Sequence, residues 1–272
     1  MSKKILLLDG YNLMYRARYS GMNRGEFSTI FNFFRGLRPL IEKFDPDIAY
    51  FVLEGMPKKR LALNEDYKGQ REYHNKDNFN EQRREIVNII SSHIPITIAR
   101  HSDYECDDVI NYLAEVTHKN DNVTIISSDT DFIQSVSENI SLYNPVRKKY
   151  IDSPDYDYVM WKSLVGDKSD NIAGFKGIGD KRAQALLSSS DSLEEFLMKS
   201  DNRKMFENNM FMIKFHDMSE DASDISYHRP ILGESNWTQL KEKFNSMDFN
   251  SIVSKDKTWN KYVNTFNKLE RN

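Results

Sequence analysis

The stretch Lys4-Ile5-Leu6-Leu7-Leu8-Asp9-Gly10 decides the fold, because a short apolar run passes directly into a carboxylate and a turn residue. Ile48–Leu53 has the same form and is followed by Glu54. Val123–Ser127 is followed closely by Asp129. Continuous apolar runs of this length are typical of strands buried in a parallel sheet. The sequence therefore predicts three buried strands, each ending near an acid.

Helical patterns lie between these runs. From Ser28 to Phe44 apolar residues recur every three or four positions, until Asp45-Pro46 stops the pattern. A second helix is expected from about Ser102 to Thr117. The residues expected on one of its faces are Val109, Tyr112, Leu113 and Val116. Alternation of strands and helices predicts an α/β domain with a parallel sheet.

The composition narrows the class of protein. A chain of 272 residues, 39% of them hydrophobic, can build one substantial core or a core with a small appended domain. Cys106 is the only cysteine, so an internal disulfide is excluded. The apolar run before Asp9 is too short for a signal peptide or a membrane span, and a cytoplasmic protein is expected.

Two further parts of the chain differ in composition from the predicted strands and helices. Residues 56–80 are rich in Lys, Arg, Asn, Glu and Tyr, which predicts an exposed excursion. After about Asp155 the pattern is helical to the end, with an interruption at Gly174–Gly179. The last forty or so residues are expected to pack onto the core through Trp237, Phe244, Trp259, Tyr262 and Phe266.

The acids at the strand ends are the main functional signal. The carboxyl ends of parallel strands share one edge of a sheet, where ligands bind. The carboxylates expected to meet there are Asp9, Glu54, Glu105, Asp107, Asp108, Asp129, Asp131, Asp167 and Asp170. Singly, Asp9-Gly10 could be only a turn, and Ser102-x-x-Glu105 only a helix capping box. Together they favour a site for Mg²⁺ or Mn²⁺, since so many like charges need cations nearby.

The net charge of −3 by itself argues against a protein that binds nucleic acid, because such proteins usually present a basic surface. The acid cluster changes this conclusion. Setting the nine acids aside changes the net charge to +6, so the rest of the surface is expected to be basic. Lys68 and Arg71 are three residues apart, so on a helix both could face one phosphate; a solvated basic face is the alternative. Gly174–Gly179 opens into Asp180-Lys181-Arg182, and such a helix start can hold a phosphate, although it could be only a helix–helix turn.

Five motifs occur in one order along the chain. They are Asp9–Leu13, Tyr67–Arg71, Glu105–Asp108, Ser128–Phe132, and Gly166–Ile172 followed by Gly177–Gly179. Together they resemble the 5′ nuclease (flap endonuclease) family, including phage-type 5′-3′ exonucleases and the 5′ nuclease domain of bacterial DNA polymerase I. The resemblance spans about Ile5 to Leu187.

The resemblance implies a domain plan. A parallel-sheet, PIN-like 5′ nuclease core would occupy residues 1–155, with an arch or clamp near 56–92. A helix-hairpin-helix DNA-binding domain would follow at 156–230. Residues 231–272 would form a C-terminal helical segment packed on the core.

The resemblance also implies roles for individual residues. The expected ligands of the first ion are Asp9, Glu54, Glu105 and Asp107, although the family usually has Asp at the position of Glu54. The second ion or its outer partners are assigned Asp108, Asp129, Asp131, Asp167 and Asp170. Catalytic electrostatic roles are assigned to Lys68 and Arg71, with Tyr67 stacking on a base and Arg16 as a further candidate. The expected DNA contacts are Lys58, Lys59, Arg60, Lys176, Gly177, Gly179, Lys181 and Arg182.

The implied function is a structure-selective 5′-3′ exonuclease and flap endonuclease that hydrolyses phosphodiester bonds of branched or 5′-ended DNA in replication or repair. Two Mg²⁺ ions are expected, with Mn²⁺ as a substitute; a K⁺ ion at the hairpin and RNA primers as substrates stay open. We expect a monomer, in the bacterial host cytoplasm if phage-encoded. The alternatives are a PIN-type ribonuclease, whose catalytic set is smaller, and a DNA-junction binding protein with a degenerate site.

Overall fold

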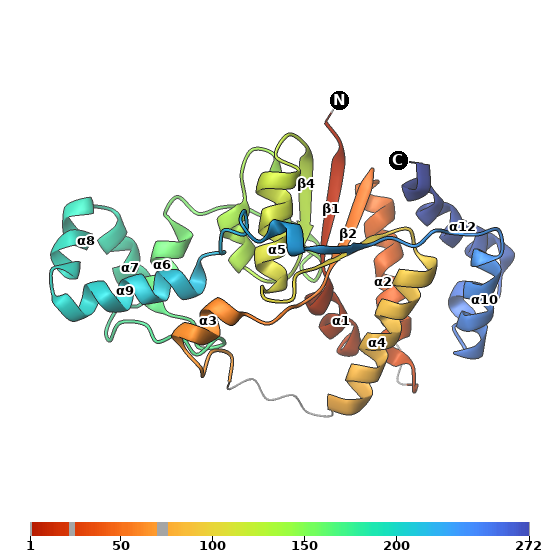
Figure 1. The fold of residues 1–272 in the computed structure, drawn as a ribbon, viewed down its shortest axis with the longest axis horizontal. Helices are drawn as coiled ribbons and strands as arrows, with labels where there is room; N and C mark the ends of the chain where they lie inside the picture. The colour runs from red at the N-terminus through yellow and green to blue at the C-terminus, as the bar shows by residue number, and fades with distance from the viewer. Residues whose placement is uncertain (1, 22–24, 70–75, 272) are drawn as a thin grey trace.

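The computed structural model describes residues 2–21, 25–69 and 76–271 (Figure 1). Within these residues one seven-stranded sheet has the order β6-β5-β4-β1-β2-β3-β7. The strands are β1 Lys4–Asp9, β2 Ile48–Val52, β3 Thr97–Arg100, β4 Asn122–Ile126, β5 Ile140–Asn144, β6 Lys149–Ile151 and β7 Ser226–His228. The five central strands pair in parallel, and β6 and β7 close the edges antiparallel. The predicted parallel sheet is confirmed, with β1 between β2 and β4.

Strand β1 shows why the sheet is buried on both faces. Leu6 and Leu8 enter one apolar cluster, with α1 (Gly10–Arg18), α2 (Ser28–Phe44) and α4 (Lys76–His93). Ile5 and Leu7 enter the other, with α5 (Cys106–Tyr112). All four side chains are at most 1% exposed. Alternate side chains of a strand point to opposite faces, so a continuous apolar run fits a sheet between two helical layers.

Helix α2 has the predicted bounds, whereas α5 does not. Helix α5 begins at Cys106 rather than at Ser102. Glu105 is the N-cap residue, and its N–H lies 3.3 Å from Asp108 Oδ2. A π-helical turn then follows at Leu113–Thr117. This wider turn breaks the 3.6-residue repeat, and Val116 is left 45% exposed. The predicted apolar face therefore ends at Leu113.

Four helices after the sheet form a small domain with a core of its own. They are α6 Tyr158–Val165, α7 Asp180–Leu187, α8 Ser190–Leu197 and α9 Ser200–Ile213. Leu164, Phe175, Ile178 and Leu193 are in its apolar cluster. After α9 the chain returns to the sheet, where β7 pairs with β3. The helical pattern after Asp155 missed this edge strand, and the last part of the predicted 156–230 domain belongs to the main sheet.

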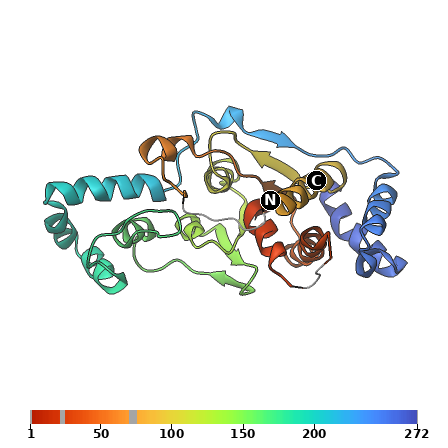
Figure 2. The ribbon, with the colours of Figure 1, turned by 90° about the horizontal axis from the view of Figure 1, so that it is seen from below.

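The C-terminal helices lie at the opposite end of the molecule from α8 (Figures 1 and 2). They are α10 Asn236–Ser246, α11 Asn250–Val253 and α12 Asp256–Asn267. Phe244, Tyr262 and Phe266 are buried and join the cluster that contains Phe34 of α2. The remaining described elements are α3 (Lys58–Leu63) and short helical turns at Asp131–Ser135, Ala222–Asp224 and Lys268–Arg271. None of the described helices is both long and apolar enough to cross a membrane.

Candidate metal centre

Asp9 stands at the carboxyl end of the central strand and caps α1. Its Oδ1 accepts the Asn12 N–H at 3.0 Å, and its Oδ2 accepts the Ser127 hydroxyl at 2.6 Å. The residue is only 5% exposed. Burial raises the pKa of Asp9 to about 6, because desolvation disfavours the charged form. Such a carboxylate is stabilised by any cation that reaches it.

Glu54 reaches the same place from β2. Its Oε2 accepts the Cys106 N–H at 3.1 Å, and burial raises its pKa to about 7. The next residue must be glycine, since a Cβ on Gly55 would lie 2.0 Å from the His101 carbonyl oxygen. This close approach brings Glu54 beside the start of α5. The longer arm of Glu54 therefore still delivers a carboxylate to the strand-end cluster.

Asp107 and Asp129 complete this first group. Burial, followed by the like charges of Asp9 and Asp129, raises the pKa of Asp107 well above its usual range. Asp129 is exposed, and its Oδ1 accepts the Asp131 N–H at 2.9 Å. Three strand ends and the first turn of α5 thus bring acids together, as predicted from the parallel topology.

A second group consists of Asp131, Asp167 and Asp170. One carboxylate oxygen from each lies within 4.8 Å of the others, a spacing that could hold a metal ion. Asp167 and Asp170 lie on a loop closed by a bridge between Asp167 and Ile172. At the start of this loop Gly166 has φ 81°, and a Cβ there would lie 2.3 Å from the Gly174 nitrogen. Glycine is therefore required at position 166, where two backbone segments approach closely.

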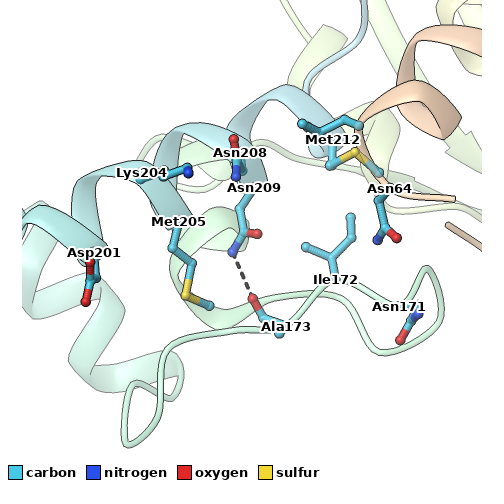
Figure 3. Close-up of a pocket in the computed structure, with 11 residues that line it drawn as sticks. Asn64, Asn171, Ile172, Ala173, Asp201, Lys204, Met205, Asn208, Asn209 and Met212 are labelled. Carbon is cyan, nitrogen blue, oxygen red and sulfur yellow. Dashed lines mark hydrogen bonds between the residues drawn. The ribbon is translucent and has the colours of Figure 1, made fainter. Parts of the chain in front are cut away.

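Asn209 of α9 fastens the same loop to the helical domain. Its Nδ2 donates to the Ala173 carbonyl at 2.8 Å and to the Ser163 carbonyl at 2.9 Å. Figure 3 shows the first of these bonds at the wall of a pocket of about 410 Å³. This pocket also adjoins Asn64 and Asn171. The loop that carries two acids therefore rests on α9 by neutral hydrogen bonds.

Lys162 is a site residue that the sequence interpretation missed. It lies on α6, is 8% exposed, and its ammonium group pairs with Asp131 and lies 2.6 Å from Asp167 Oδ2. Burial alone would lower the pKa of Lys162, but Asp131 and other contacts raise it overall. The sequence contained one indication of this role: Lys162 lies in a short, mostly apolar helix, next to Trp161 and two residues before Leu164.

Lys68 is the second internal cation, but it does not lie on a helix. It pairs with Glu105, its Nζ lies 3.8 Å from Asp170 Oδ2, and it has φ 56° in a turn. The predicted helical pairing of Lys68 with Arg71 is therefore wrong for Lys68, and Arg71 lies outside the described residues. Tyr67 is 6% exposed, and its hydroxyl lies 3.1 Å from Glu105 Oε2. Base stacking by Tyr67 does not fit this burial.

Arg60 requires the largest correction. It was expected to contact DNA from the start of an exposed excursion, but it is only 3% exposed. Its guanidinium donates to both oxygens of Asp108, at 2.7 and 2.9 Å. Both oxygens of Asp108 are bonded to Arg60 and to backbone N–H groups, which does not fit a direct metal ligand; its predicted role as an outer partner stays a prediction. The neighbouring Lys58 and Lys59 are exposed and pair with Asp103 and Asp221.

The glycine hairpin presents the predicted DNA-binding residues to solvent. Phe175 and Ile178 are buried beneath it, while Gly177 has φ 79° at its tip. The exposed residues around the turn and the start of α7 are Lys176, Gly177, Gly179, Lys181 and Arg182. Arg16 lies half-buried on α1, where burial lowers its pKa. Its predicted catalytic role stays a prediction.

The donor set fits hard divalent cations. Eight carboxylates from the two groups and Glu105 offer oxygen ligands of the kind that Mg²⁺ prefers. The protein itself neutralises part of the charge, because Arg60, Lys68 and Lys162 lie among these acids. Counting those three cations with the nine acids leaves a net charge of +3 on the rest of the chain, rather than the +6 expected.

Two family models match the chain. A model described as the 5′-3′ exonuclease N-terminal resolvase-like domain matches residues 4–162, more than half of the sequence. A model described as the 5′-3′ exonuclease C-terminal SAM fold matches residues 154–225. The chain belongs to the 5′-3′ exonuclease family. The predicted 5′ nuclease is therefore confirmed at the level of the family.

Relatives differ in how much of their length the chain covers. A 5′-3′ exonuclease of Aquifex aeolicus is 30% identical over an alignment that covers 92% of this chain and 94% of the relative. The DNA polymerase I of Lactococcus lactis subsp. cremoris is 28% identical over 93% of this chain. That match covers only 33% of the Lactococcus polymerase. A separate match to the thermostable DNA polymerase I of Thermus filiformis covers 26% of that protein. The chain thus spans about a third or less of these polymerases.

Two solved structures share the fold of this chain. The bacteriophage T5 D15 flap endonuclease matches 93% of this chain and 100% of its own, with a TM-score of 0.67 and 17% identity. Flap endonuclease-1 from Methanococcus jannaschii matches 99% of this chain and 93% of its own, with a TM-score of 0.65 and 16% identity. These likenesses confirm the predicted sheet core with its appended helical domain.

Without metal, this exonuclease is expected to lose stability as the pH rises from about 4 to about 7. Burial raises the pKa values of Asp9 and Glu54 from 3.8 and 4.5 to about 6 and about 7. In this window the folded protein therefore binds more protons than the unfolded chain, so raising the pH favours unfolding. The pKa of Asp167 is lowered to about 2, so this residue changes the stability only at lower pH.

Thermal unfolding in EDTA and in excess Mg²⁺ checks this expectation. A pKa difference of one unit is worth about 1.4 kcal/mol, and about 1 kcal/mol shifts Tm by roughly 2–4 °C in a chain of this size. We expect a fall of several degrees in EDTA, which Mg²⁺ suppresses and Asp9→Asn reduces. A metal-free Tm that stays level or rises across the window would contradict it.

Proposed function

We propose that this chain is a structure-selective 5′ nuclease that hydrolyses phosphodiester bonds of branched or 5′-ended DNA by a two-metal mechanism. The observation that carries the proposal is the convergence of acids from β1, β2, β4, α5 and the loop after α6. Membership of the 5′-3′ exonuclease family supports the direction of attack. A protein of the same fold, T5 D15, has been crystallised with DNA and metal ions.

We assign the acids to two cations. Asp9, Glu54, Glu105, Asp107 and Asp129 would hold the first. Asp131, Asp167 and Asp170 would hold the second, because their oxygens already lie within 4.8 Å of one another. Two such cations, when bound, activate water and stabilise the leaving oxygen of an in-line displacement. Mg²⁺ is the proposed ion, with Mn²⁺ as a substitute.

Lys68 and Lys162 supply positive charge from the protein. Each ammonium group pairs with carboxylates of the proposed ligand sets, and we propose that both contact the scissile phosphate. A fixed ammonium in a partly buried site stabilises the negative charge that develops on phosphate oxygens. Burial and ion pairing keep both side chains ordered before DNA arrives.

The hairpin before α7 is the proposed grip on duplex DNA. Lys176, Lys181 and Arg182 are exposed there, and the N-terminus of α7 adds backbone N–H donors. Such contacts hold phosphates without reading sequence, so the shape of the substrate selects it. We also propose that the protein acts as a cytoplasmic monomer and that a K⁺ ion can sit at the hairpin. RNA–DNA hybrids are proposed as secondary substrates.

One assay tests the proposal against its rivals. The full chain is incubated with a 5′-labelled flap duplex, with single-stranded DNA and with single-stranded RNA, in Mg²⁺ or in EDTA. Cleavage near the flap junction, seen only with Mg²⁺, is the expected result. Tight flap binding with no cleavage in Mg²⁺ or Mn²⁺ would instead identify a junction-binding protein. Preferential cleavage of single-stranded RNA would identify a PIN-type ribonuclease.

A further inference from the structure

Arg60 uses all of its hydrogen-bonding capacity inside the protein. Nη1 donates to Glu105 Oε2 and to Asp108 Oδ2, both at 2.7 Å. Nη2 donates to Asp108 Oδ1 at 2.9 Å and to the Lys214 carbonyl at 3.1 Å. Nε donates to the Met212 carbonyl at 2.9 Å. A rigid planar fork of donors suits such a set of partners, and lysine could not reproduce it.

Asp108 is the fixed anchor of this arrangement. Besides the two bonds from Arg60, its Oδ1 accepts the His216 N–H at 2.8 Å and its Oδ2 lies 3.3 Å from the Glu105 N–H. Both oxygens accept hydrogen bonds, and the residue is buried. Asp108 therefore holds Arg60 in place.

Glu105 is held from the side that faces Arg60. Its Oε2 accepts from Arg60 and lies 3.1 Å from the Tyr67 hydroxyl, while Oε1 pairs with Lys68. Partners of this kind orient a metal-binding carboxylate and limit its rotation. Arg60 thus fixes the orientation of the Glu105 carboxylate through its Oε2 atom.

Arg60 also holds the end of the helical domain. Met212 and Lys214 lie at the C-terminal end of α9, where the last carbonyls have no partner within the helix and the helix dipole is negative. The guanidinium satisfies two of these carbonyls and complements that dipole. The His216 N–H reaches Asp108, so the chain leaving α9 is bound to the same pair.

We propose that Arg60 is a positioning residue that orients Glu105 toward the first cation and clamps the C-terminal end of α9 to the metal centre. The metal half of this inference rests on the proposed function, because Glu105 is a ligand only there. The Arg60 side chain thus joins the helical domain, the proposed grip on duplex DNA, to a proposed metal ligand. Neither contact involves DNA, which distinguishes the role from the one expected from sequence.

The test variant is Arg60→Lys, which keeps the charge and loses the fork. Isothermal titration of the DNA-free protein with Mn²⁺ is expected to show affinity about 10- to 100-fold weaker than wild type, the usual effect of removing an outer partner of a ligand. Amide hydrogen exchange at residues 213–216 is expected to become faster. Flap-DNA affinity in EDTA is expected to change less than about threefold, since an exposed basic contact is not being removed.

Arg203→Lys is the matched control, because Arg203 also lies on α9 and pairs with a glutamate, Glu194 at 2.6 Å, but is exposed. It is expected to leave Mn²⁺ affinity and exchange unchanged. If Arg60→Lys fails to fold, Asp108→Asn provides the measurement: it keeps Arg60 and weakens its anchor, with the same two effects expected. Wild-type Mn²⁺ affinity, or wild-type exchange at 213–216, in a folded variant would overturn the proposal. Because these readouts need no cleavage, they stay informative even if the flap assay fails.

Discussion

Asp131→Asn should abolish most cleavage while DNA binding is retained. Asp131 shares the second group with Asp167 and Asp170, and Lys162 and the Tyr158 hydroxyl both contact its Oδ1. Asparagine keeps the shape but removes the charge that a divalent cation requires. Because even outer partners of a ligand are worth 10–100-fold, we expect the single-turnover rate on a 5′-flap duplex to fall by more than about 100-fold.

The measurement pairs that rate with flap affinity in EDTA, determined by fluorescence anisotropy. Asp152→Asn is the control, since Asp152 is an exposed acid between the sheet and α6. It should behave as wild type. A wild-type cleavage rate for Asp131→Asn would remove this residue from the metal site.

Lys68→Ala is expected to lower turnover by about 100-fold, the loss typical when one charge-stabilising group is removed from an active site. The reason is its position: the ammonium group pairs with Glu105, lies 3.8 Å from Asp170 Oδ2, and its side chain is only 20% exposed. Such a group can act on the charge that develops at the phosphate, so the loss should appear in kcat rather than in KM.

Steady-state kinetics on the flap duplex at several salt concentrations checks the expected split. Lys168→Ala is the control, because Lys168 is an exposed lysine on the loop between Asp167 and Asp170. An effect of Lys68→Ala on KM alone, with a shallower salt dependence of binding, would show that Lys68 only positions phosphate.

The strands and their acids could be predicted from local pattern. Apolar runs such as Lys4–Leu8 report burial on both faces of a sheet, and strand direction then decides where the following acid lies. Helix α2 was equally readable, since its apolar repeat covers four turns and ends at Asp45-Pro46. The start of α5 was not, because Ser102 and Glu105 both suit a cap and only packing chooses between them.

The basic residues were harder to place than the acids. Arg60 was expected to contact DNA, Lys68 was expected to face a phosphate, and Lys162 was not singled out. Lysine and arginine are rarely buried without partners, so sequence pattern favours exposed positions for them. Their partners are distant in the chain: Arg60 meets Glu105 and Asp108 some 45 residues later and the end of α9 more than 150 residues later. No local spacing encodes such pairs.

The sequence by itself therefore determined three central strands of the sheet, the edge where the acids meet, and the preference of that edge for a divalent cation. These follow from short-range periodicity and from the fixed geometry of parallel strands. Only the tertiary structure decided which charges serve the site from inside: Asp108 is an anchor, Arg60 a clamp, and Lys68 and Lys162 counter-ions within the acid cluster. The physical reason is that burying a charge is favourable only beside a specific partner, and partners from distant segments exist only once the chain has folded.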